Sequence, residues 1–238
     1  MHCGRASLAL LAALVAACAF GSSAIACNGG PYVYAGLAGK RQVAGVGAAL
    51  VAAPLGFSVR SGHVAGWVGV GGPGQGPGGS DEWIQVGFSA FPAWNGNDLY
   101  YEVARPGARP VYSLIRAGVT SGTRVRVSVL ELRGRRDWWR VWVNGSPASK
   151  PIHLPASHAR WRPVVTAESW DAGSTGCNDF AYRFGAIRVV LRPGGTWVPL
   201  RGTLPIESTD NTFVVRGTNG DLVAAGGENG RALARNLR

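Results

Sequence analysis

The sequence predicts an all-β protein in which two antiparallel sheets pack as a β-sandwich or jelly roll. Three observations support this prediction. Short segments alternate apolar and polar residues, turn residues such as glycine, proline, asparagine and aspartate separate them, and no segment keeps a helical period. We see no internal repeat and no second domain, so we expect one β domain over residues 27–216.

The predicted strands follow one another from about residue 31. Pro31–Leu37 runs into a glycine-rich turn, and Gln42–Ala52 is small and apolar with glycines that disfavour a helix. Each later strand is bounded by turn residues: Val64–Val70, Trp83–Phe88, Leu99–Ala104, Val111–Ile115, Arg124–Leu132, Trp138–Val143, Val164–Trp170, Tyr182–Leu191, Val198–Leu200 and Thr212–Arg216.

The sequence also predicts the loops and turns that connect these strands. Gly71–Gly79 is rich in glycine and proline and predicts a flexible loop, and it is not a phosphate-binding loop because no Lys-Ser/Thr closes it. Arg133–Arg136 predicts a hairpin between its two flanking strands, and Asn144-Gly145 predicts a turn. We expect the tail over residues 217–238 to be flexible, because glycine, asparagine and arginine are common in it.

The first 26 residues have the sequence features of a signal peptide. Arg5 supplies a positive charge, Leu8–Phe20 is apolar but short for a membrane span, and Ala24-Ile25-Ala26 fits the small-x-small cleavage rule. We therefore expect a secreted, extracellular protein without a transmembrane segment. The alternative is a lipid anchor at Cys18, since Val15-Ala16-Ala17-Cys18 is similar to a lipoprotein box.

Two further properties follow from composition. Cys27 and Cys177 would remain after cleavage, and a pair of cysteines in an oxidising compartment predicts one disulfide. The formal net charge is +11, nearly all from arginine, which makes an anionic cell-wall polymer a candidate partner. Solubility outside the cell is the alternative explanation of the charge. We expect a monomer without a specific nucleic-acid partner.

Several chemistries have little support. His63, His153 and His158 sit apart without metal-ligand spacing, so we expect no metal and no cofactor. No G-x-S-x-G elbow and no Cys–His arrangement points to a serine or cysteine hydrolase. The cluster of Trp138, Trp139 and Trp142 is typical of sandwich packing, and the nearby arginines are typical of a solvated strand face.

Alternation along four strands places polar and aromatic residues together, away from the core. Ile84, Val86 and Phe88 share one face of their strand, and the opposite face carries Gln85. The same pattern elsewhere gives one shared set of outward residues: Trp67, Trp83, Gln85, Tyr100, Glu102, Glu168 and Trp170. An aromatic-walled groove with one amide and two carboxyls suits a hydrolytic site, and ordinary exposed positions are the alternative.

At these residues the chain resembles the eqolisin family of glutamic peptidases, over about Tyr34 to Val215. The segments that carry the resemblance are Tyr34-Ala35-Gly36, Gly66-Trp67-Val68-Gly69-Val70, Trp83-Ile84-Gln85-Val86-Gly87, Tyr100-Tyr101-Glu102, Val165-Thr166-Ala167-Glu168-Ser169-Trp170 and Phe184-Gly185-Ala186-Ile187. The resemblance implies a concanavalin-like sandwich and an acid endopeptidase that uses no metal or cofactor.

By the same resemblance, Gln85 and Glu168 would be the catalytic pair, with Trp67 lining the cleft and Glu102 at a supporting acidic position. Trp83, Tyr100 and Trp170 would contact a peptide or protein substrate. The chain departs from the family where Gly71 and Ser89 stand in place of two aspartates. These losses leave open a shifted pH optimum or an inactive relative.

Two alternative functions use the same groove. A non-catalytic module that binds carbohydrate or peptide fits this architecture, because a fold does not fix a function. A glycosidase with Glu102 and Glu168 as its carboxyl pair has less support, since no E-x-D-x-x-E strand signature accompanies them. If Gln85 and Glu168 lie within reach of one water, with an open cleft above them, the peptidase is favoured over the binding module.

Overall fold

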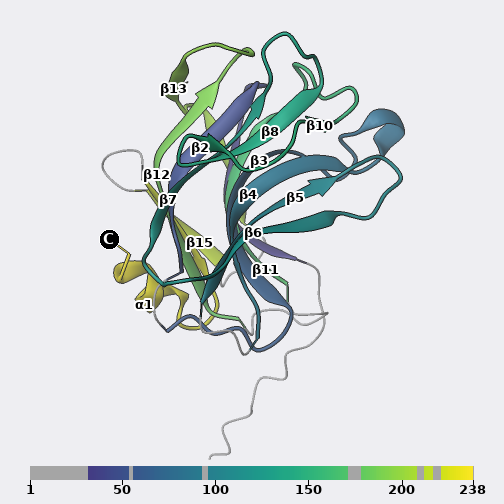
Figure 1. Cartoon of the computed structure of the whole chain (residues 1–238). Helices are drawn as coiled ribbons and strands as arrows, with labels where there is room; N and C mark the ends of the chain where they lie inside the picture. Colours follow the sequence, from purple (N-terminus) through teal and green to yellow (C-terminus); the bar gives the residue numbers. More distant parts are fainter. Residues whose placement is uncertain are drawn as a thin grey trace, which may run out of the picture.

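Two antiparallel sheets lie face to face in the computed structural model, which describes residues 32–53, 56–92, 96–170, 178–207, 212–216 and 221–237 (Figure 1). Within these residues the first sheet has seven strands. In spatial order they are β14 (Thr203–Glu207), β1 (Val33–Gly39), β11 (Pro163–Trp170), β3 (His63–Gly72), β4 (Glu82–Ala90), β5 (Asn97–Ala104) and β6 (Val111–Val119). The predicted all-β sandwich is thereby confirmed.

The second sheet has nine strands among the described residues. Its spatial order is β10 (Ile152–His153), β8 (Trp138–Val143), β7 (Arg124–Glu131), β2 (Gly45–Val51), β12 (Phe180–Val190), β16 (Leu222–Gly226) and β15 (Thr212–Arg216). Two short strands are added at its margins, β13 (Trp197–Pro199) beside β12 and β9 (Ser146–Pro147) beside β8.

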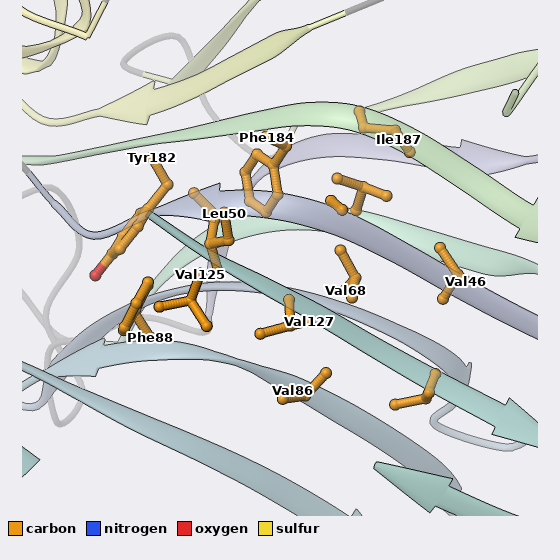
Figure 2. Packing of buried hydrophobic residues seen from close by; sticks show 14 of the residues in the cluster. Val46, Leu50, Val68, Val86, Phe88, Val125, Val127, Tyr182, Phe184 and Ile187 are labelled. Atoms are coloured by element: carbon orange, nitrogen blue, oxygen red, sulfur yellow. The ribbon is translucent and has the colours of Figure 1, made fainter. Parts of the chain in front are cut away.

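The core lies between the sheets and follows the alternation of the sequence. Val68, Val86 and Phe88 from the first sheet meet Leu50 and Val127 from the second, and all five side chains are buried (Figure 2). Because neighbouring residues of a strand point to opposite faces, burying these residues turns Trp67, Gln85 and Gly87 away from the core.

The strand register determines where the polar residues meet. β3 pairs with β11 on one side and with β4 on the other, so it separates Glu168 from Gln85 within one sheet. Trp67 of β3 lies opposite both Thr166 and Gly87. An ideal Cβ at position 87 would come within 2.7 Å of the Cβ of Trp67, which explains the glycine beside this indole.

The predicted connections over 133–136 and 144–145 are confirmed. β7 and β8 are antiparallel neighbours around Arg133–Arg136. Asn144 and Gly145 have φ values of 49° and 84°, as a tight turn of the type I′ class requires, and they join β8 to β9. A short 3-10 helix, η1 (Pro77–Gly79), lies within the predicted loop.

The C-terminal segment differs from the prediction. We expected the domain to end near residue 216, but β16 pairs with β12 and β15, and a helix, α1 (Gly230–Arg235), packs against it. Leu233, Ala234 and Leu237 form a second apolar cluster with residues of β12 and β16. The sandwich therefore includes residues that we had placed in a flexible tail.

Some predictions fall outside the described residues. They are the signal peptide over 1–26, the lipid-anchor alternative at Cys18, and the disulfide between Cys27 and Cys177. In the part of the chain that the structure describes, no helix is long and apolar enough to cross a membrane.

Candidate functional site

A cavity of about 820 Å³ opens on the face of the first sheet that points away from the core. Its walls come from strands that are far apart in the chain, including β1, β3, β4, β5, β6 and β11. Of the seven residues predicted to share a groove, six line this cavity: Trp67, Trp83, Gln85, Tyr100, Glu102 and Glu168. The seventh, Trp170, stacks with Tyr32 at 6.1 Å between ring centroids, and Tyr32 lines the cavity.

Gln85 is held at the floor of the cavity. Its side chain is buried, with 6% of the residue exposed, and Nε2 donates a hydrogen bond of 3.1 Å to the hydroxyl of Tyr100. Tyr100 is the one hydrogen-bond partner of this carboxamide among the described residues. The second amide hydrogen and the carbonyl oxygen are therefore available to a bound water or substrate.

Glu168 enters the same cavity from β11. Only 5% of the residue is exposed, and Oε1 lies 3.6 Å from Nε2 of His63. Tyr34 pairs directly with Glu168 across β1 and β11, and burial together with the charge of Glu168 raises the pKa of the Tyr34 phenol. The neighbouring phenols therefore keep their protons and can donate hydrogen bonds near this carboxyl group.

Electrostatic coupling links the two halves of the cavity. Burial and then the charge of Glu168 raise the pKa of Tyr100, the residue that holds Gln85. Burial raises the pKa of Glu102 as well, Glu168 raises it further, and hydrogen bonding to Trp83 and the charge of His63 lower it. Trp83 Nε1 donates to Glu102 Oε1 at 3.0 Å.

Trp67 lies on β3, between the strands of Gln85 and Glu168. Its Nε1 is buried and has no hydrogen-bond partner in the described part of the chain. An unsatisfied buried donor is costly, since water hydrogen bonds are lost without replacement. The indole as a whole lines the cavity, between the strands that carry Gln85 and Glu168.

Sequence reasoning missed several aromatic residues of the cavity. His63, Phe91 and Tyr112 line it, and ring contacts connect them, with centroids 5.9 Å apart for His63–Phe91 and 6.0 Å apart for Phe91–Tyr112. Tyr112 also stacks on Tyr100 at 4.8 Å. The alternation signal was available for His63, because it lies four residues before Trp67 on the same face of β3.

The two departures from the eqolisin pattern have local structural reasons. Gly71 has φ +85°, and an ideal Cβ there would lie 2.4 Å from the carbonyl oxygen of Glu82, so an aspartate does not fit this backbone. Ser89 is buried, and its Oγ is 2.9 Å from the hydroxyl of Tyr112. Ser89 therefore stands where the family has its second aspartate, and it makes a polar contact with Tyr112.

The described residues hold no group of three or more His, Cys, Asp or Glu side chains that could bind a metal ion. The tryptophan cluster is divided: Trp139 is fully buried in the core, whereas Trp138 and Trp142 are half-buried and lie beneath Arg135 and Arg140. Arg124 and Arg126 alternate with buried valines and are exposed on the outer face of the second sheet. These arginines do not line the cavity.

Comparisons with known proteins support the fold. No family model and no curated protein matches the sequence. Among solved structures, a scytalido-glutamic peptidase with a peptide-based transition-state analogue is similar with a TM-score of 0.57 and 17% identity, covering 82% of this chain and 97% of that one. SCP-B, an eqolisin-family peptidase in complex with the tripeptide Ala-Ile-His, has a TM-score of 0.53, with the same identity and coverage. At this identity the likeness is to the fold, which this chain shares with eqolisin peptidases.

Proposed function

We propose that the chain is an endopeptidase of glutamic type, which hydrolyses peptide bonds with Gln85, Glu168 and an activated water. One observation carries the proposal: an amide and a carboxylate from distant parts of the chain line one cavity on the same face of one sheet. The similar fold of two eqolisin peptidases supports the reaction class.

In the proposed reaction Glu168 acts first as a general base. It removes a proton from a water as the water oxygen adds to the carbonyl carbon of the scissile bond. The carbon–nitrogen bond then breaks, and the same carboxyl group gives the proton to the leaving amine. The products are a carboxylic acid and an amine, and the carboxylate of Glu168 is restored.

Gln85 has the electrostatic role in this scheme. Its free amide hydrogen would donate to the oxyanion of the tetrahedral intermediate, and its carbonyl oxygen would accept a hydrogen bond from the water. A carboxamide is neutral at every pH, so this role is retained in acid. The bond to Tyr100 fixes which way the amide points before substrate binds.

The remaining cavity residues would bind the peptide. Trp67, Trp83, Tyr100 and Glu102 line the cavity, and Trp170 stands at its edge through its contact with Tyr32. These groups need no metal or cofactor for the proposed step.

Further properties complete the proposal. The leader segment supports secretion, with a lipid anchor at Cys18 as the alternative, and Cys27 and Cys177 support a disulfide in the exported protein. We propose a monomer. The exposed arginines of the second sheet keep an anionic wall polymer as a candidate partner.

The test is cleavage of a denatured protein by the mature chain, from acid to mildly alkaline pH, with pepstatin and a chelator present. Glu168→Gln should lower kcat by at least about 10³-fold and Gln85→Ala by about 10²- to 10³-fold, because each removes a group of the reaction. Glu228→Gln, an exposed carboxyl outside the cavity, is the matched control and should keep full activity. Circular dichroism checks that each variant is folded.

A second candidate is a binding module without catalysis. The observation that favours it is the stacked pair Tyr32 and Trp170, with 40% and 36% exposure at the cavity edge, which is an aromatic platform of the kind that binds sugars and peptides. Binding of a peptide or glycan by the wild-type chain, with no cleavage at any pH, would select this function.

A further inference from the structure

The cavity has a charge opposite to that of the protein. The chain carries 24 Lys and Arg residues against 13 Asp and Glu, but no Lys or Arg is among the described residues that line the cavity. In the same described part of the chain, Glu102 and Glu168 line it together with aromatic rings. Among the described lining residues, His63 is therefore the one basic side chain beside these two acids.

Glu102 is enclosed by aromatic side chains. It pairs across strands with Tyr112 of β6, it shares its face with Tyr100 two residues earlier, and its Oε1 accepts the hydrogen bond of Trp83. Tyr100 and Tyr112 stack with an interplanar angle of 11°. Oε2 of Glu102 has no hydrogen-bond partner within the described residues, so one carboxylate oxygen is free inside an aromatic cage.

We propose that this cage, formed by Trp83, Tyr100, Glu102 and Tyr112, binds the cationic side chain of a lysine or arginine in the substrate. Glu102 supplies the counter-charge, and the ring of Tyr112, which is 39% exposed, gives a surface for the apolar stem of the lysine or arginine. The aromatic walls also exclude water, which strengthens the charge pair relative to one on an open surface.

The place of this residue relative to the cut bond rests on the proposed function. Gln85 and Glu102 are direct partners across β4 and β5, and such partners have Cβ atoms about 4.5–5.5 Å apart. A lysine or arginine held at Glu102 therefore has its charged group beside Gln85, in the same cavity. The substrate class is a peptide with a basic residue near the scissile bond.

The preference for a lysine or arginine side chain depends on the ionisation of Glu102. Burial and the charge of Glu168 raise the pKa of this carboxyl, and the Trp83 hydrogen bond and the charge of His63 lower it. Gln85 and the two tyrosines that also face Glu102 carry no charge in this range. Because the pKa is raised, Glu102 takes up a proton at a higher pH than an ordinary glutamate, so the preference for a cation should fade on acidification.

Binding tests the cage without requiring catalysis. The probes are two acetylated and amidated peptides that differ only in lysine or norleucine, titrated by calorimetry into the mature Glu168→Gln chain. We expect the lysine peptide to bind about tenfold more tightly near neutral pH, with less difference in acid. The added substitution Glu102→Gln, which can still accept from Trp83, should reduce the preference to within about twofold.

The outcomes of these titrations test the binding of a cation at Glu102 separately from the peptidase activity. Glu228→Gln in the same background removes an equal charge outside the cavity and should keep the tenfold preference. Equal binding of both peptides, or a preference that survives Glu102→Gln, would overturn the cage. If the wild-type chain cuts neither peptide but the preference is found and is lost in Glu102→Gln, the cage stands and the peptidase proposal fails.

Discussion

Single side chains show what the alternation of apolar and polar residues along a strand can predict and what it cannot. It placed Gln85 and Glu168 on the same side of the sheet, since each is flanked by residues that are buried in the core, such as Val86 and Ala167. It could not show that Tyr112 stacks on Tyr100, because that contact depends on how β6 pairs with β5. It also could not show the positive φ of Gly71, which excludes a side chain there.

Tyr100 gives a prediction at this scale. Tyr100→Phe keeps the stacked ring but loses the hydroxyl that accepts from Gln85 Nε2, so the amide is no longer held in place. We expect kcat/KM on a quenched peptide to fall about five- to tenfold, the effect of one hydrogen bond of about 1 kcal/mol. Tyr101→Phe, on the opposite face of β5, is the matched control and should change the rate little. Equal losses in the two variants would remove the positioning role of Tyr100.

At the scale of elements, the strands with regular alternation were predicted and β16 was not. Leu222 and Ala224 of β16 lie in the main core, whereas Val223 and Ala225 pack on α1, so both faces of the strand are buried. A strand of this kind has no polar face and therefore no period of two. The short helix that covers it is too brief for a helical period to be recognised.

Leu233 tests whether this C-terminal layer belongs to the domain. Leu233→Ala removes a buried side chain from the cluster with Val223 and Ala225, and the free energy of unfolding should fall by about 2–3 kcal/mol. Arg235→Ala, an exposed position of α1, should change it by less than about 0.5 kcal/mol. Denaturant unfolding measures both, and a neutral Leu233→Ala would support the flexible tail that the sequence suggested.

For the whole molecule, the sequence predicted the fold class and the face that carries the cavity, but not the depth of the cavity. Depth arises from side chains of β1, β6 and β11 that converge only after the sheet is assembled, as Tyr34, Tyr112 and Glu168 do. The sequence also gave no sign that one acid, Glu82, lies on the core side of β4. It is fully buried, and both carboxylate oxygens are without a partner in the described part of the chain.

Glu82 should make the molecule more stable in acid. Burial, and secondarily the charge of Asp137, raise its pKa to about 7, against the influence of Arg160. Below about pH 4.5 the carboxyl is protonated in both the folded and the unfolded chain, so its ionisation does not change the free energy of unfolding. Between about pH 4.5 and 7 the unfolded chain releases the proton while the folded chain keeps it, so stability falls as pH rises through this window and stays lower above it.

Glu82→Gln removes this dependence. Between about pH 4 and pH 8 the wild-type chain should lose roughly 2–3 kcal/mol more unfolding free energy than the variant, measured by denaturant titration at several pH values. Glu228→Gln, at an exposed position, should follow the wild-type curve. Parallel curves for wild type and Glu82→Gln would show that this carboxyl is not what sets the pH response.

The central claim is that Glu168 is the general base of a peptide hydrolysis. The most direct measurement compares the initial rates at which the mature wild-type and Glu168→Gln chains cleave one quenched peptide, at the wild-type pH optimum. The account predicts hydrolysis by the wild type and a loss of at least about 10³-fold in a folded Glu168→Gln chain. Cleavage by Glu168→Gln at a rate close to that of the wild type would contradict it.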